Sequence, residues 1–507
     1  MRPDAGRAPL RGGLSFAWCS RWSKTEVCAE QREDLRRFLL VVWVWYKAAF
    51  KKRLGVLLRN EGLFAMKMNC RSVLSLTAGV VALGLSACSN SSSNPQASRT
   101  AAQVANAGNF TSVYYLGDSL TAGFQSDSLI DTSQPHGWAP LVATQLGFPI
   151  ALPLIAPPGA PNQLTLVSLS PLVLGELAGT TTGRDDFTLQ PTNVAVPGAL
   201  TNDVLNTLPL LAPTTGQEQL NQLVLGYPGF GYGVIKSQAQ QAAAANPTTI
   251  FLWIGNNDVL VADETGMPSS MTPLATFTTE YQQLIAYLQA NADAHLVIAN
   301  IPDVTAVPYL TPAVEVLAEA SAETGVPVAN LSALLGIQAG DLVNPTGTAE
   351  IPLILAGQQA GPITDAGFLS AAEVVTVQAQ VTAFNQVIAA SAKSAGATLV
   401  DINALFAQTA ANGITENGIP GTTTFLGGVF SLDGIHPTNT GYAVIANTFI
   451  DTINTSLSKT YPEVNVAAIA AVDPLYPPYP GHAALRMPVL PKVSAERLRE
   501  IIGARKR

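Results

Sequence analysis

The feature that most constrains the fold is an alternation of short apolar runs with longer helical segments, which begins near residue 110. The runs are rich in β-branched residues, so we predict strands that are buried on both faces. Strands that alternate with helices favour a three-layer α/β/α sandwich with about five parallel strands. The predicted strands are 113–116, 192–196, 249–254, 296–301 and 398–402, and the main predicted helices are 236–245, 277–292, 371–394 and 440–456.

Three stretches interrupt this alternation, and we interpret them as insertions. Residues 150–190 are rich in Pro and Leu, 206–233 end in GYPGFGYG, and 303–366 contain many prolines. The glycine cluster matches no phosphate-binding pattern, so a plain loop is expected there. We therefore predict one domain with insertions over residues 110–457, followed by a Pro-rich and then basic tail over 458–507.

Residues 66–87 have the pattern of a secretory signal peptide. Lys67 and Arg71 precede an apolar run that is too short for a membrane span and ends in small residues. The sequence LSAC, which ends at Cys88, resembles a lipobox, where bacterial lipoproteins are cleaved before a cysteine that is then acylated. We predict lipidation of Cys88 and a polar tether over 88–109. An ordinary signal peptide with an incidental cysteine is the alternative.

Residues 1–65 precede this leader and are basic, with 13 Lys or Arg against six Asp or Glu. Because a signal peptide stands at the N-terminus of its protein, we expect translation to start at Met66 or Met68 and residues 1–65 not to be made. A cytosolic tail is the alternative. The expected location is the cell envelope, with the lipoprotein anchored at the outer membrane or the periplasmic face, or secretion.

The charge and cysteine content exclude several kinds of partner and site. Residues 91–485 carry five Lys or Arg against 27 Asp or Glu, a surface that repels phosphate, so no nucleic-acid partner is expected. All four cysteines lie at or before Cys88, which excludes a disulfide framework or a cysteine-ligated metal from the domain. No H-E-x-x-H occurs either, and we expect neither a metal nor a cofactor.

A serine, a histidine and a carboxylate have positions that suit nucleophilic catalysis. Ser119 follows the first predicted strand, at the end where open α/β sheets bind ligands, and its amide can face a developing oxyanion. Asp433 precedes His436 by one turn of loop in DGIHP, so the carboxylate can fold back and orient the ring. No comparable carboxylate accompanies the other histidines, which are His136, His295 and His482.

Four blocks in order resemble those of the GDSL, or SGNH, esterases and lipases. They are GDSL at 117–120, NVAVPGA at 193–199, GNND at 255–258 and DGIHP at 433–437, and NIPD at 300–303 adds to the likeness. The resemblance covers about residues 110–457 and implies a flavodoxin-like sandwich that hydrolyses esters through an acyl-enzyme. The long gap between the third and last blocks and the insertion at 150–190 depart from a compact member.

The resemblance also assigns roles to individual residues. It implies a catalytic triad of Ser119, His436 and Asp433. It implies an oxyanion hole formed by the amides of Ser119 and Gly198 and the side chain of Asn257. Asn256 takes the variable position of the third block, with its side chain expected to point away from the site.

Structural roles for the same residues are the alternatives. Ser119 could be a helix N-cap, Gly198 a permissive backbone position and Asn257 a turn cap. We expect Asp118 and Asp258 to brace loops rather than to contact substrate. The expected substrate is a carboxylic ester of a lipid or an O-acylated glycan, and the anchor at Cys88 would bring the protein to a membrane. A non-catalytic envelope protein that binds a glycan or lipid is the competing function.

Overall fold

The computed structural model describes residues 99–476. The predicted upstream extension, the signal peptide, Cys88, His482 and the basic end of the C-terminal tail lie outside the described residues. No helix between residues 99 and 476 is long and apolar enough to span a membrane.

A parallel sheet of four strands, in the order β1-β4-β5-β9, forms the centre of the fold. Its strands are β1 (Val113–Gly117), β4 (Thr249–Trp253), β5 (His295–Ala299) and β9 (Thr398–Val400). The fifth predicted strand, 192–196, is wrong as a full strand. It forms one parallel bridge, between Asn193 and Tyr115, on the outer edge of β1. The amides of Val194 and Val196 donate to the carbonyls of Tyr115 and Gly117, but the amide of Gly117 donates to the side chain of Gln238 at 2.9 Å, so the ladder is not continued.

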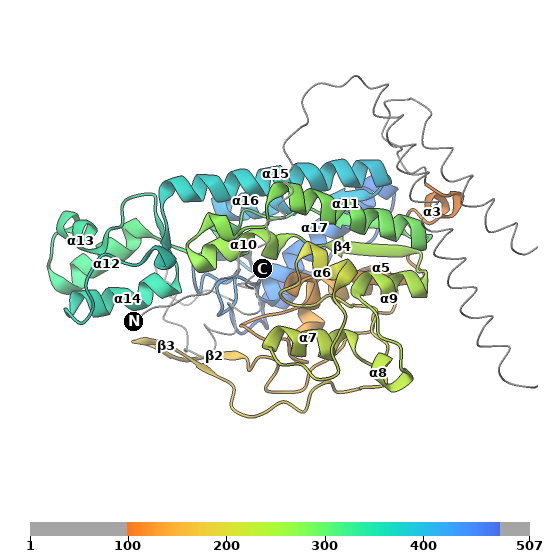
Figure 1. The fold of residues 1–507 in the computed structure, drawn as a ribbon, viewed down its shortest axis with the longest axis horizontal. Helices are drawn as coiled ribbons and strands as arrows, with labels where there is room; N and C mark the ends of the chain where they lie inside the picture. The colour runs from red at the N-terminus through yellow and green to blue at the C-terminus, as the bar shows by residue number, and fades with distance from the viewer. Residues whose placement is uncertain (1–98, 477–507) are drawn as a thin grey trace, which may run out of the picture. The chain divides into compact units, whose positions relative to one another are not determined.

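Helices cover both faces of the sheet, which gives the predicted α/β/α sandwich. On one face Leu116, Leu252 and Ile298 pack against α6 (Thr201–Asn206), α9 (Gln238–Ala245), α11 (Leu274–Asn291) and α15 (Ala371–Ala395). On the other face Tyr115 and Phe251 pack against α5 (Trp138–Leu146), α16 (Ile402–Asn412) and α17 (Asn439–Leu457). Figure 1 shows α11 and α15 running side by side.

Aromatic stacking fixes the helices on each face. In one layer Phe277 of α11 stacks on Phe384 of α15, with ring centroids 3.7 Å apart. In the other, Trp138 of α5 stacks on Phe449 of α17 at 3.9 Å. Since large aromatic side chains dominate the energy of burial, these pairs set the helix layers that support the strand ends.

The three predicted insertions lie outside the central sheet. The first contains the hairpin β2 (Leu164–Leu169) and β3 (Leu172–Glu176), and the second contains α7 (Gly216–Leu225) and α8 (Gly229–Tyr232). The third contains the helices α12 (Ala313–Thr324), α13 (Val328–Leu335) and α14 (Pro345–Leu355) and the short strands β6 (Thr311–Pro312) and β7 (Leu342–Val343). Strand β7 also pairs with β8 (Phe368–Leu369), which follows the insertion. Its helices share a separate apolar cluster that includes Leu331 and Ile351. The third insertion thus has a core of its own.

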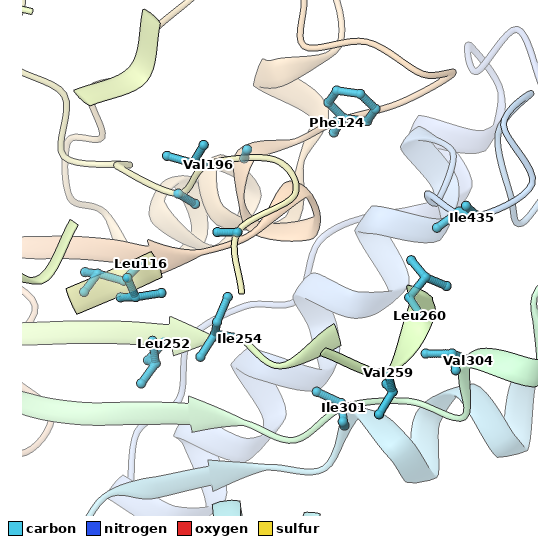
Figure 2. Close-up of a cluster of buried hydrophobic side chains, with 14 of the residues drawn as sticks. Leu116, Phe124, Val196, Leu252, Ile254, Val259, Leu260, Ile301, Val304 and Ile435 are labelled. Atoms are coloured by element: carbon cyan, nitrogen blue, oxygen red, sulfur yellow. The ribbon is translucent and has the colours of Figure 1, made fainter. Parts of the chain in front are cut away.

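The remaining helices and strands are short. They are α3 (Ala101–Ala105), α4 (Ser119–Ala122), α10 (Asn256–Thr265), α18 (Val466–Ala470) and the hairpin β10 (Ile414–Glu416) and β11 (Ile419–Gly421). Of these, α4 and α10 follow directly on β1 and β4. Around them the main apolar cluster extends beyond the sheet and includes Phe124, Leu260 and Ile435, which Figure 2 shows near the ends of the strands.

Candidate active site

Ser119 is the first residue of α4, directly after β1. The turn before it requires glycine, because a Cβ on Gly117 would lie 2.3 Å from the carbonyl oxygen of Trp253 on the neighbouring strand. The N-cap of α4 is Asp118, whose carboxylate accepts a hydrogen bond from the amide of Leu120 at 3.1 Å. The alternative role of Ser119 as the N-cap is therefore wrong.

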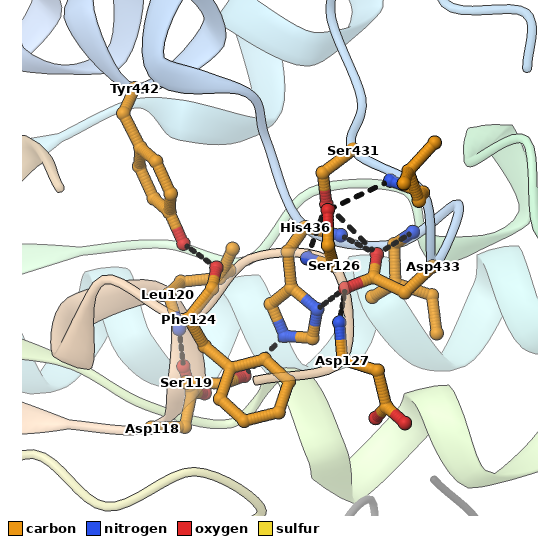
Figure 3. Close-up of polar contacts among 12 residues, drawn as sticks. Asp118, Ser119, Leu120, Phe124, Ser126, Asp127, Ser431, Asp433, His436 and Tyr442 are labelled. Atoms are coloured by element: carbon orange, nitrogen blue, oxygen red, sulfur yellow. Dashed lines mark hydrogen bonds and ion pairs between the residues drawn. The ribbon is translucent and has the colours of Figure 1, made fainter. Parts of the chain in front are cut away.

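The structure brings Ser119, His436 and Asp433 into one chain of hydrogen bonds (Figure 3). His436 Nε2 lies 2.8 Å from Ser119 Oγ, and His436 Nδ1 lies 2.9 Å from Asp433 Oδ2. A neutral ring that donates from Nδ1 to the carboxylate can accept the serine proton at Nε2. All three side chains are buried, with Ser119 6% and His436 1% exposed.

Asp433 is held by several donors besides His436. Its Oδ1 accepts the amides of Ile435 and His436, each at 2.8 Å, and its Oδ2 accepts the amide of Asp127 at 2.8 Å. Burial alone would raise the pKa of Asp433. The adjacent His436 and these amide hydrogen bonds outweigh burial and hold the pKa below its ordinary value. The carboxylate is thus ionised where it faces the imidazole.

The turn that supplies the Asp127 amide was missed by sequence reasoning. Ser126 and Asp127 both have left-handed backbone angles, with φ of +49° and +59°. The amide of Ser126 donates to Ser431 Oγ at 2.9 Å, and the amide of Leu432 donates to Ser126 Oγ at 3.3 Å. This turn therefore clamps the loop that carries Asp433. A serine in the left-handed region follows no local preference, so no sequence signal indicated it.

The predicted oxyanion donors come from three segments that follow neighbouring parts of the sheet: the start of α4, the start of α10, and the segment after Val196, whose amide donates to the carbonyl of Gly117 at 3.1 Å. Among residues 99–476, no hydrogen bond is formed by the amide N–H of Ser119 or of Gly198. Gly198 has φ of +74°, which favours glycine. Asn257, in the first turn of α10, uses one N–H of its side-chain amide to donate to the carbonyl of Ala199 at 3.0 Å. The two backbone amides and the second N–H of the Asn257 side chain therefore have no hydrogen-bond partner among the described residues.

The aspartates expected to brace loops do so. Asp258 accepts hydrogen bonds from the amide and hydroxyl of Thr201, each at 2.9 Å, and from the hydroxyl of Thr272 at 2.6 Å. It therefore holds the segment after Gly198 against α10.

The prediction that the Asn256 side chain points away from the site is wrong. Asn256 is buried and its amide donates to Asp118 Oδ2 at 2.8 Å, because the end of β4 lies beside the end of β1. Burial raises the pKa of Asp118 to about 7, and the hydrogen bonds from Asn256 and Leu120 limit that rise.

Two further side chains hold the nucleophile segment. Gln238 of α9 donates to the carbonyl of Gly117 at 3.0 Å and accepts its amide at 2.9 Å. Asn193 donates to the carbonyl of Thr121 in α4 at 2.7 Å. Both contacts join segments that are far apart in the sequence, so local patterns did not reveal them.

The other described histidines lie apart from this chain of hydrogen bonds. The ring of His295 on β5 is 3.0 Å from Thr398 Oγ1, and burial together with Arg99 lowers the pKa of His295 to about 4. His136 ends a short 3-10 helix. Residues 99–476 contain no cluster of His, Cys, Asp or Glu side chains that could hold a metal.

Comparison with known proteins gives one family match. A family model described as "GDSL-like Lipase/Acylhydrolase" matches residues 113–449. No curated protein matches the sequence. Solved structures similar to the chain include a catalytic mutant of an acetylxylan esterase from Geobacillus stearothermophilus. The two sequences are 10% identical, the match covers 69% of this chain and 96% of that chain, and the TM-score is 0.30. A phospholipase A1 from Streptomyces albidoflavus NA297 is 15% identical, the match covers 68% of this chain and 99% of that chain, and the TM-score is 0.30.

Proposed function

The chain belongs to the GDSL-like lipase and acylhydrolase family and is a carboxylic ester hydrolase, and from this premise we propose that it works through a Ser119-His436-Asp433 triad and an acyl-enzyme. One observation carries the proposal: the hydrogen bonds of 2.8 Å and 2.9 Å that join the serine, the imidazole and the carboxylate. Serine needs such a base because its hydroxyl is a weak nucleophile.

In the first half-reaction Ser119 Oγ attacks the ester carbonyl while His436 Nε2 takes the hydroxyl proton. Asp433 stays ionised and stabilises the imidazolium that forms. When the tetrahedral intermediate collapses, His436 gives the proton to the oxygen of the leaving alcohol, and the acyl group remains on Ser119. In the second half-reaction a water gives its proton to His436 and attacks the acyl-enzyme carbonyl. The new tetrahedral intermediate collapses, the bond to Ser119 Oγ breaks, His436 returns the proton to that oxygen, and the acid is released.

The negative charge on the intermediate needs donors that are already in place. We propose that these are the amides of Ser119 and Gly198 and the second N–H of the Asn257 side chain. The support is that neither backbone amide has another partner among residues 99–476 and that Asn257 commits one N–H to Ala199.

A fluorophosphonate probe tests the nucleophile. We expect the purified wild-type protein to be labelled at Ser119 and the Ser119→Ala variant to resist labelling. A wild-type protein that folds but stays unlabelled would favour the competing function, a non-catalytic module that binds a glycan or lipid.

We further propose that the protein is a lipoprotein of the cell envelope, anchored through an acylated Cys88. The support is the leader at 66–87 and the LSAC sequence that follows its apolar run. An anchor with two or three acyl chains gives stable attachment, since each buried methylene contributes about 0.8 kcal/mol. The ester substrate would then be met at or near the membrane.

A further inference from the structure

A cavity of about 640 Å³ lies between the first two insertions. One wall is formed by residues 159–162 and 179–181 of the first insertion, and the other by residues 213–216, 219, 220 and 222, before and within α7. Figure 1 shows α7 on the side of the fold away from α15. The volume lies within the range of about 300–1,000 Å³ that is usual for small-molecule sites.

Each wall of the cavity is joined to a part of the catalytic site. In the first wall, the carbonyl of Pro161 accepts a hydrogen bond from Ser128 Oγ at 2.6 Å, and Ser128 adjoins Asp127, whose amide donates to Asp433. In the second wall, Gln217 adjoins Gly216 and donates to the carbonyl of Pro197 at 2.8 Å. The first wall thus contacts the turn that holds Asp433, and the second contacts Pro197, the residue before the proposed oxyanion donor Gly198. The cavity therefore lies between these two supports of the site.

The lining has the chemistry of a site for a neutral, hydroxyl-rich molecule. It contains threonine hydroxyls, the amides of Asn162, Gln219 and Gln222, and the apolar surfaces of Pro161 and Pro213, but no ionisable side chain. The nearest charge on the second wall is the Glu218 carboxylate, which accepts hydrogen bonds from lining residues Thr214 and Thr215 and would repel an anionic ligand. An acyl chain would leave the polar groups of the lining unpaired. A sugar ring presents hydroxyl edges together with an apolar C–H face.

Thr180 and Gln219 are the side chains best placed to recognise such a ligand. Among residues 99–476 neither side chain has a hydrogen-bond partner, and both are exposed. In contrast, Asn162 is committed to the carbonyls of Leu177 and Gly179, at 3.0 Å and 3.2 Å, and so shapes the wall.

We propose that this cavity binds the alcohol portion of the substrate and that this portion is an uncharged saccharide. The enzyme would then remove acyl groups from an O-acylated neutral glycan, which rests on the proposed function. Ser119 takes the acyl group, the saccharide oxygen takes the proton from His436, and water releases the carboxylic acid. Of the two substrates that the sequence left open, lipid and glycan, the lining favours the glycan.

The test compares two acetyl esters that differ only in their alcohol. Thr180→Val and Gln219→Leu are combined, because they remove the free polar groups and keep the side-chain size. With an O-acetylated xylo-oligosaccharide, the double variant should lose about tenfold in kcat/KM, chiefly through KM, as expected for two lost hydrogen bonds. With 4-nitrophenyl acetate it should match the wild type. Gln283→Leu, an exposed change on α11, is the matched control and should leave both substrates unaffected.

The remaining outcomes separate the two proposals. If wild-type protein hydrolyses 4-nitrophenyl esters but not the acetylated saccharide, or if the double variant loses both activities equally, the saccharide site is refuted and the esterase remains. If an anionic, O-acetylated galacturonan oligosaccharide is as good a substrate as the neutral one, the requirement for a neutral ligand is refuted. A protein inactive on every ester would overturn the proposed function itself.

Discussion

Replacing Asn257 by alanine separates a catalytic role of this side chain from a structural one. The side-chain amide carries two N–H groups, of which one donates to the carbonyl of Ala199 at 3.0 Å. If the second N–H stabilises the oxyanion, it acts on charge that exists only in the transition state. The substitution therefore removes both a buried hydrogen bond and a catalytic donor.

The two losses have different magnitudes and different readouts. Loss of one oxyanion donor lowers kcat by about 10²–10³, or roughly 2.7–4 kcal/mol, with little change in KM. Loss of the donor to Ala199 leaves a buried carbonyl unpaired, which costs about 1–3 kcal/mol of unfolding free energy. We expect both effects in Asn257→Ala, measured by steady-state kinetics on 4-nitrophenyl acetate and by denaturant unfolding.

Asn344→Ala is the matched control for this experiment. Asn344 is also buried, and its side-chain amide donates to backbone carbonyls, among them that of Asp263 at 3.0 Å. It lies in the third insertion, apart from the triad, so its replacement should lower the unfolding free energy and leave kcat unchanged. If Asn257→Ala behaves like Asn344→Ala, with lost stability and a near-normal kcat, Asn257 is a structural cap and the oxyanion assignment is wrong.

Four further predictions concern the site and the leader. Ser119→Ala and His436→Ala should each remove nearly all activity, and their double variant should be hardly worse, because the residues act as one unit; multiplicative losses would contradict a shared triad. Asp433→Asn should also be severe, since it favours the wrong imidazole tautomer. Burial raises the native pKa of Asp118 to about 7, so between pH 4 and 7 the native state holds a proton that the unfolded state has released. The free energy of unfolding should therefore fall by up to about 4 kcal/mol as the pH rises from 4 to 7, and this fall should be smaller in Asp118→Asn. Denaturant unfolding at each pH measures both. Cys88→Ala should release the protein from the membrane fraction of the cells. Translation should start at Met66 or Met68, and a peptide from residues 1–65 detected by mass spectrometry of the cells would contradict that start.

The fold class could be predicted because the strands are buried on both faces. Four of the five apolar runs became strands of the sheet, with ends that differ by a few residues from the predicted ones. The helix predicted from residue 236 begins at Gln238, since the Ser237 side chain caps it by accepting the amide of Gln240. The segment 192–196 has the same apolar pattern, but it forms only a bridge because the side chain of Gln238 takes the amide of Gly117 that would continue the ladder.

The positions of the site residues could be predicted because they follow strand ends or stand close together in sequence. Parallel strands bring their carboxyl ends to one edge, which places Ser119 after β1 near Asn257 after β4. The supports of these residues could not be predicted in this way. Gln238, which binds Gly117, lies on a helix with no distinguishing pattern, and the turn at Ser126 requires a backbone angle that serine disfavours.

The long gap between the third and last sequence blocks is compatible with an ordered triad because the inserted chain folds on its own core. Side chains of α12, α13 and α14 pack in a cluster separate from the two that cover the sheet. Lengthening a connection costs little once the added residues are ordered by their own contacts, since each doubling of a flexible loop adds only about 0.6 kcal/mol. The insertion also contributes to the site, because the amide of Tyr309 donates to the carbonyl of Gly434 at 2.9 Å, next to Asp433. Its first residues therefore help to hold the loop that carries the triad carboxylate.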